Sequence, residues 1–80
     1  MKVSIHSIKS TLFSGEAEKL LAHTPQGQIT ILDNHIPLIT KLIGPAVVAV
    51  DRAGQTQDIP LNSGILEVRP ESEVVILAQV

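Results

Sequence analysis

Turn-forming residues recur along this chain at intervals of about ten residues, and no other feature of the sequence constrains the fold as strongly. Such spacing is typical of antiparallel β-sandwiches and barrels, in which tight turns join short strands. Residues 15–22 come closest to a helical period, but the short connections on either side argue against a helical crossover. The sequence therefore predicts an all-β domain, with turn signals at Ser14–Gly15, Pro25–Gly27, Asp33–Pro37, Gly44–Pro45, Ala53–Gly54, Asn62–Gly64 and Pro70.

The runs between these signals are rich in β-branched residues, which pack well on a pleated sheet. In Gln28–Ile31 polar and apolar residues alternate, so Ile29 and Ile31 are expected to face a core. Two other runs, Ala46–Val50 and Val74–Ala78, are apolar on both faces, so their outer side chains form either a partner surface or a barrel rim covered by loops. The predicted strands cover residues 3–8, 17–24, 28–32, 38–42, 46–52, 56–61, 65–69 and 73–78. The predicted core comprises Val3, Ile5, Phe13, Ile29, Ile31, Val48, Val50, Leu66, Val68, Val74 and Ile76.

Four glycines are interpreted as turn residues: Gly15, Gly27, Gly54 and Gly64. Gly54 lies in a predicted hairpin over residues 52–55, where a residue without a Cβ can adopt a positive φ. The dipeptide Gly44–Pro45 joins a flexible residue to one of fixed φ, and it predicts a break between two strands.

Length and composition narrow the class of protein. The 80 residues suffice for one small domain over residues 1–80, and 44% of them are apolar, which favours folding over disorder. A net charge of −2 and a single aromatic residue offer neither a basic footprint nor a stacking platform for nucleic acid. There is no cysteine, signal peptide or apolar run long enough to cross a membrane as a helix. We expect a soluble cytosolic domain that another protein partly covers.

Few residues could carry chemistry. Asp33 and His35 have the spacing of two metal ligands on an extended segment, but a zinc or iron site needs three or four ligands, and His6 and His23 would have to converge on them. We interpret Asp33 and Asn34 as an Asx-type turn before Pro37, with His35 as a loop residue. Asn62–Gly64 is also interpreted as a turn, because it lacks the flanking glycines of a nucleophile elbow. The sequence predicts no catalytic residue, no metal site and no cofactor.

Three blocks of the sequence resemble the epsilon subunit of F-type rotary ATP synthases. The first joins Leu12–Gly15 to Gly27–Thr40, which is similar to the family pattern F-S-G followed by G-x-[LI]-x-[IV]-x-P-x-H-x-P-L-[LI]-T. Ser63–Val68 resembles the pattern G-G-[FI]-[LA]-E-V, and Val74–Ala78 resembles V-x-[VI]-L-A. The blocks occur in the family's order and at its spacing.

The resemblance implies a flattened antiparallel β-sandwich of about ten short strands in the central stalk of the rotor. In this family one side of the sandwich packs on the gamma subunit and its lower end meets the c-ring, at the cytoplasmic face of the membrane and without inserting into it. The domain performs no chemistry and helps to couple proton flow to ATP synthesis. By match to the motif, Gln28, His35 and Thr40 are expected near the c-ring or the foot of gamma.

The chain departs from the family pattern at three places. Asp33 replaces the usual Pro, which is expected to reshape the loop that faces the c-ring, and Ser63 replaces the first Gly of a pair, so only Gly64 is expected to need unusual backbone angles. Family members also continue into a C-terminal helical hairpin, whereas this sequence stops at Val80. Any inhibitory or ATP-sensing role of that hairpin is therefore not expected here.

Two other functions stay open on the sequence alone. One is a free-standing β-sandwich that binds a protein outside the synthase, and the other is a small metal-dependent enzyme that uses Asp33 and His35. Co-purification with gamma distinguishes the first from a synthase subunit, and metal analysis tests the second.

Overall fold

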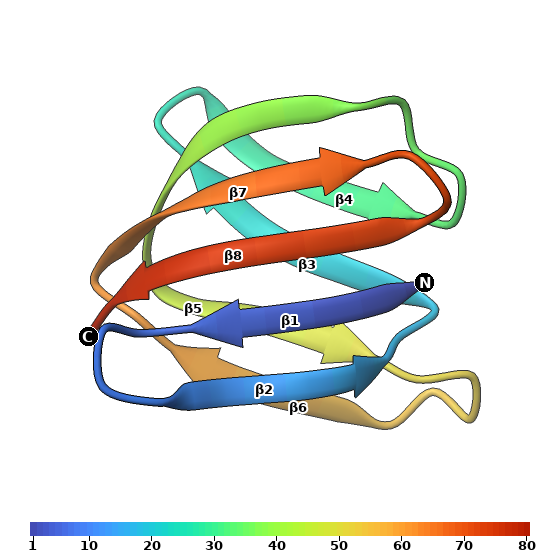
Figure 1. Ribbon diagram of the computed structural model, residues 1–80, viewed down its shortest axis with the longest axis horizontal. Coiled ribbons are helices and arrows are strands. Elements are labelled where there is room, and N and C mark those ends of the chain that lie inside the picture. Colours follow the sequence, from blue (N-terminus) through green and yellow to red (C-terminus); the bar gives the residue numbers. More distant parts are fainter.

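The computed structural model describes residues 1–80 as eight strands joined by short turns and loops (Figure 1). None of its elements is a helix that could span a membrane. An all-β fold is thus confirmed, with eight strands in place of about ten. The strands are β1 (Lys2–His6), β2 (Thr11–Glu16), β3 (Lys19–Thr24), β4 (Gly27–Leu32), β5 (Leu38–Val50), β6 (Thr56–Pro60), β7 (Ser63–Arg69) and β8 (Glu73–Gln79).

All eight strands belong to one sheet that folds over on itself into two layers (Figure 1). The strand order is β2-β1-β8-β7-β5-β3-β4, and β6 pairs with β5. The β7–β8 layer comprises β2, β1, β8, β7 and the first half of β5, while the β3–β4 layer comprises β4, β3, the second half of β5 and β6. Every pairing is antiparallel except β1 with β8, which run parallel.

Strand β5 joins the two layers, and the strand break predicted at Gly44–Pro45 is wrong. Residues 38–43 pair with β7, and residues 46–50 pair with β6 in the other layer. The backbone stays hydrogen-bonded through the bend, because the Gly44 N–H donates to the Asn62 carbonyl and the Leu61 N–H donates to the Pro45 carbonyl, both at 3.0 Å. A Cβ at Gly44 would lie 2.6 Å from the Leu61 carbonyl oxygen, so the bend has room only for glycine.

Strand β2 was missed by the sequence prediction, which placed a turn at Ser14–Gly15. The chain turns earlier, at Ser7–Ser10, where the Ser7 hydroxyl accepts hydrogen bonds from the backbone N–H groups of Lys9 and Ser10 at 3.2 and 3.1 Å. A serine hydroxyl can organise a turn in this way without glycine or proline. Gly15 consequently lies inside a strand, opposite Val3 of β1.

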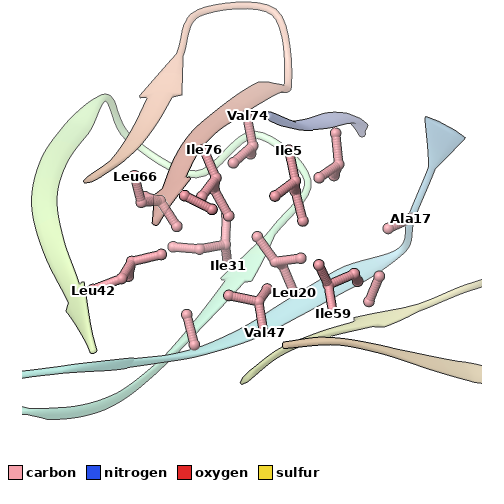
Figure 2. Packing of buried hydrophobic residues seen from close by; sticks show 14 of the residues in the cluster. Ile5, Ala17, Leu20, Ile31, Leu42, Val47, Ile59, Leu66, Val74 and Ile76 are labelled. Carbon is pink, nitrogen blue, oxygen red and sulfur yellow. The ribbon is translucent and has the colours of Figure 1, made fainter. Parts of the chain in front are cut away.

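The hydrophobic core lies between the two layers (Figure 2). Of the predicted core residues, Phe13 and Ile29 are half-buried against the core, and Val50 is buried outside the main cluster. The prediction of Val48 as a core residue is wrong, because Val47 occupies the core position and Val48 points to the outer face. An error of one residue in the predicted alternation moves a side chain to the opposite face of the strand. The other predicted core residues are buried in the cluster: Val3, Ile5, Ile31, Leu66, Val68, Val74 and Ile76.

The predicted turn glycines fall into two groups. Gly27 and Gly54 lie next to and within turns and have φ values of 130° and 84°, in the region that favours glycine. Gly64 lies inside β7 and has no positive φ, which corrects the expectation of unusual backbone angles there. It is needed for space, because a Cβ at this position would lie 2.7 Å from the Leu77 carbonyl oxygen.

Candidate partner surface

Large apolar side chains gather on the outer side of the β7–β8 layer. Leu66 and Ile76 point into the core, so their neighbours along β7 and β8 point outward. Ile65 and Leu77 are directly opposite each other in the sheet, and they are 44% and 60% exposed. We call the outward-facing set Ile39, Ile43, Ile65, Val75 and Leu77 the apolar face; it extends over β5, β7 and β8.

Charged residues interrupt the apolar face, because Glu67 lies between Ile39 and Val75 in the sheet and Lys41 lies between Ile39 and Ile43 along β5. Lys41 lies beside Ile65 on β5 and forms no ion pair. Toward the β7–β8 turn, the Arg69 guanidinium contacts Glu67 at 3.1 Å and Glu73 at 4.0 Å. Exposed pairs of this kind contribute little to stability, and this one places charges both within and beside the set of apolar side chains.

A shallow groove runs along the apolar face near the end of β8. Its walls include Ile8, Lys41, Ile43 and Leu77, and its lining is mainly apolar. No loop covers Leu77, so the outer side chains of Val74–Ala78 form an open surface and not a covered barrel rim. A surface of this composition can bind a partner by burying apolar area.

The structure does not bring the three residues predicted at the partner contact into one patch. Gln28 is exposed near the β3–β4 turn at the start of β4, whereas His35 follows the other end of that strand. Because β4 advances about 3.3 Å per residue, these positions are separated by most of a strand's length. Thr40 is half-buried on the core side of β5, since it lies opposite Leu66.

In the loop between β4 and β5, residues 33–37, the side chains of Asp33 and His35 each contact another part of the chain and not one another. Asp33 Oδ1 lies 2.7 Å from the N-terminal ammonium of Met1. His35 Nδ1 donates a hydrogen bond of 2.7 Å to the Ile36 carbonyl. No group of three His, Cys, Asp or Glu residues converges anywhere in the structure, and His6 and His23 lie on β1 and β3, in different layers.

Sequence reasoning did not single out as site residues three residues in or beside this loop: Asn34, Ile36 and Ser72 of the β7–β8 turn. Asn34 has a φ of 61°, and its backbone N–H donates to Ser72 Oγ at 2.9 Å. Ile36 is 75% exposed at the tip of the loop. The Asn residue before Pro37 is a local turn signal, but the contact with Ser72 joins positions 38 residues apart, and no local pattern could reveal it.

Comparison with known proteins gives a family match over the whole chain. Residues 1–80 match the model of the β-sandwich domain of the ATP synthase delta/epsilon chain. The chain is 40% identical over 78 residues to the ATP synthase epsilon chain of Herminiimonas arsenicoxydans, covering 95% of this chain and 55% of that protein. It is 41% identical over 78 residues to the epsilon chain of Hydrogenovibrio crunogenus, covering 98% and 53%. This chain thus spans about half the length of these relatives.

Solved structures with low sequence identity share the fold. A chain in the Tetrahymena thermophila mitochondrial ATP synthase central stalk and c-ring structure matches with a TM-score of 0.79 at 13% identity, over 99% of this chain and 63% of that one. A chain in the Euglena gracilis mitochondrial ATP synthase structure matches with a TM-score of 0.85 at 15% identity, over 95% and 48%. At these identities the likeness supports the sandwich architecture.

Proposed function

Because the chain belongs to the family of ATP synthase delta/epsilon β-sandwich domains, we propose that it is a non-catalytic subunit of the rotor of an F-type ATP synthase. In this role it packs on the gamma subunit, contacts the c-ring and helps to couple proton flow to ATP synthesis. It acts as a peripheral component at the cytoplasmic face of the membrane, without entering the bilayer.

The observation that carries this proposal is the apolar face. Ile39, Ile65 and Leu77 are 69%, 44% and 60% exposed on adjacent strands of a domain that already buries a core of 17 residues. Large apolar side chains exposed together on one face of a sheet are typical of surfaces that bind another protein, and polar side chains commonly lie among or around them. We assign gamma to this face, because it presents exposed apolar side chains from three adjacent strands that another folded subunit can bury.

The two separated ends of β4 suggest two different contacts. Gln28, beside the β3–β4 turn, is proposed to approach a polar loop of the c-ring. His35 and the rest of the β4–β5 loop lie at the opposite end of that strand and are proposed to approach the foot of gamma. Thr40 is proposed to support the partner surface indirectly. It packs on the core side of β5, the strand that carries Ile39 and Lys41 on its outer face.

Reconstitution with the cognate rotor tests the proposal. The purified chain is mixed with gamma and with the gamma–c-ring subcomplex, and binding is followed by gel filtration and calorimetry. We expect a one-to-one complex with gamma and tighter binding when the c-ring is present. Failure to bind either preparation would contradict the proposal and favour a free-standing binding module outside the synthase.

A further inference from the structure

Two turns that are far apart in sequence meet at one end of the sandwich. The β4–β5 loop, residues 33–37, lies against the β7–β8 turn, residues 70–72, on the side of Figure 1 where the N-terminus lies. The loop passes from the β3–β4 layer to the β7–β8 layer, so its position depends on what holds it at this end.

Ser72 and Asn34 join the two turns through a reciprocal pair of hydrogen bonds. The Asn34 backbone N–H donates to Ser72 Oγ at 2.9 Å, and the Ser72 hydroxyl donates to Asn34 Oδ1 at 3.0 Å. The φ values of Asn34 and Ser72 are 61° and 55°. Positive φ values cost non-glycine residues conformational energy unless local contacts compensate. Ser72 is itself tied to β1, because its carbonyl accepts a hydrogen bond from the Lys2 N–H at 2.9 Å.

The loop held in this way presents an apolar side chain. Ile36 is 75% exposed, and none of its side-chain atoms is needed by the core. The residues that follow it lead directly to the apolar face, because Pro37 and Ile39 line one shallow depression together with Pro70 of the β7–β8 turn. Ile36 immediately precedes Pro37 of this depression, so it lies at the edge of the surface assigned to gamma.

We propose that Ser72 is a positioning residue, which fixes the β4–β5 loop so that Ile36 serves as an anchor for gamma at the edge of the apolar face. This inference rests on the proposed function. The partner it names is the same gamma subunit, because a single folded surface that covers Ile39 also reaches the tip of the adjoining loop. Without the Ser72 hydroxyl the loop keeps its sequence but loses its fixed position, and binding must then order it again.

Two matched substitutions distinguish the effect of losing the Ser72 hydroxyl from the effect of placing a glycine at a positive φ in this turn. Ser72→Gly removes the hydroxyl and suits the positive φ, while Glu71→Gly suits a φ of 65° at the neighbouring position and removes no hydrogen bond to the loop. We expect the exchange rate of the Asn34 amide proton to rise about fivefold in Ser72→Gly, since this amide loses its acceptor and the Asn34 side chain loses its donor. In Glu71→Gly it is expected to stay at the wild-type value.

Binding to purified gamma, measured by calorimetry, completes the test. Ser72→Gly is expected to raise the Kd about threefold to tenfold, and Ile36→Ser about tenfold or more without changing the exchange of the Asn34 amide. If the wild-type chain binds gamma and either variant binds equally well, the positioning role is overturned while the proposed function stands. If the wild-type chain does not bind gamma, the proposed function itself fails, and the assignment of Ile36 as a gamma anchor fails with it.

Discussion

The two outer faces of the sandwich follow the same alternation of side chains and yet have different surfaces. On the β7–β8 layer, the row across the strands reads Leu77, Ile65 and Lys41. On the β3–β4 layer, the central row has half-buried Leu21 and Val48 flanked by exposed Thr30 and Asp58. Each row has an apolar pair flanked by polar side chains, His6 and Lys41 on the first face and Thr30 and Asp58 on the second. The difference is that Leu77 and Ile65 are exposed, whereas Leu21 and Val48 are half-buried.

This difference shows which part of the sequence determines the fold and which determines the partner. Both inner faces need apolar residues at most of their inward-pointing positions, because they bury the common core. The outer positions are free of that requirement, so an apolar residue kept there indicates a second surface to be covered. Strand β5 contributes to both outer faces, and its bend at Gly44 separates Ile39 and Ile43 from Val48.

The largest expected effect comes from breaking the core that both layers share. Leu66→Ala should lower the free energy of unfolding by about 2–5 kcal/mol, because Leu66 is fully buried. Its neighbour Ile65 points to the outer face, so Ile65→Ala should cost less than about 1 kcal/mol in the free chain. Urea unfolding of the two variants measures the difference, and equal losses would contradict the assignment of inner and outer positions.

A second pair of variants tests the two outer faces directly. Leu77 and Leu32 are similarly exposed, at 60% and 54%, but lie on the β7–β8 and β3–β4 layers respectively. Leu77→Ser should weaken binding to gamma about tenfold to thirtyfold, and Leu32→Ser should leave it unchanged. Calorimetry with purified gamma gives both values. A stronger effect of Leu32→Ser would assign gamma to the opposite face.

A smaller effect is expected at the turn between β5 and β6, which belongs to the β3–β4 layer. Gly54 has a φ of 84°, and a Cβ at this position would meet no atom within 4 Å, so Gly54→Ala strains only the backbone. We expect a loss of about 1–2 kcal/mol in stability and unchanged affinity for gamma. Gly15→Ala is the control, because Gly15 lacks a positive φ and a Cβ there would meet Phe13 at an ordinary 3.7 Å. Thermal unfolding compares the two variants, and an equal loss in both would rule out backbone strain as the cause.

The smallest effect concerns Gln28, at the end of β4 assigned to the c-ring. If the facing c-ring loop carries an arginine, Gln28→Glu should tighten binding to the gamma–c-ring subcomplex about twofold to fivefold at low salt, because a charged acceptor makes the stronger hydrogen bond. Salt should reduce this gain, and binding to gamma alone should not change. A gain that is independent of salt would show that charge plays no part at this position.

The alternating and β-branched runs made most of the fold predictable, including the strand Val74–Ala78, whereas the exposure of its outer residue Leu77 was decided only by the structure. The errors occurred where distant contacts override local signals. The composition of Gly44–Pro45 predicts a strand break, but β5 continues through it. The Gly44 N–H donates to the Asn62 carbonyl, and the Leu61 N–H donates to the Pro45 carbonyl. Strand β2 was hidden because Ser14–Gly15 has the composition of a turn.

The partner surface was less predictable than the fold. The motif match predicted Gln28, His35 and Thr40 near the c-ring or the foot of gamma, and the structure places them at the two ends of β4 and on the core side of β5. Ser72 carries no local sign of its role, since its partner Asn34 is 38 residues away. The apolar face likewise needs the register of three strands, which only the folded chain provides.

The parallel pairing of β1 with β8 has a consequence for how the chain is made. Lys2 and Glu73 are in register although they are about 70 residues apart in sequence. During synthesis at about 5–20 residues per second, β1 therefore waits roughly 4–14 seconds for the strand beside it. Until then it has only β2, and an isolated hairpin is marginally stable in water. The nascent chain must keep Val3 and Ile5 from aggregating over that interval, so folding is expected to complete only after β8 has left the ribosome.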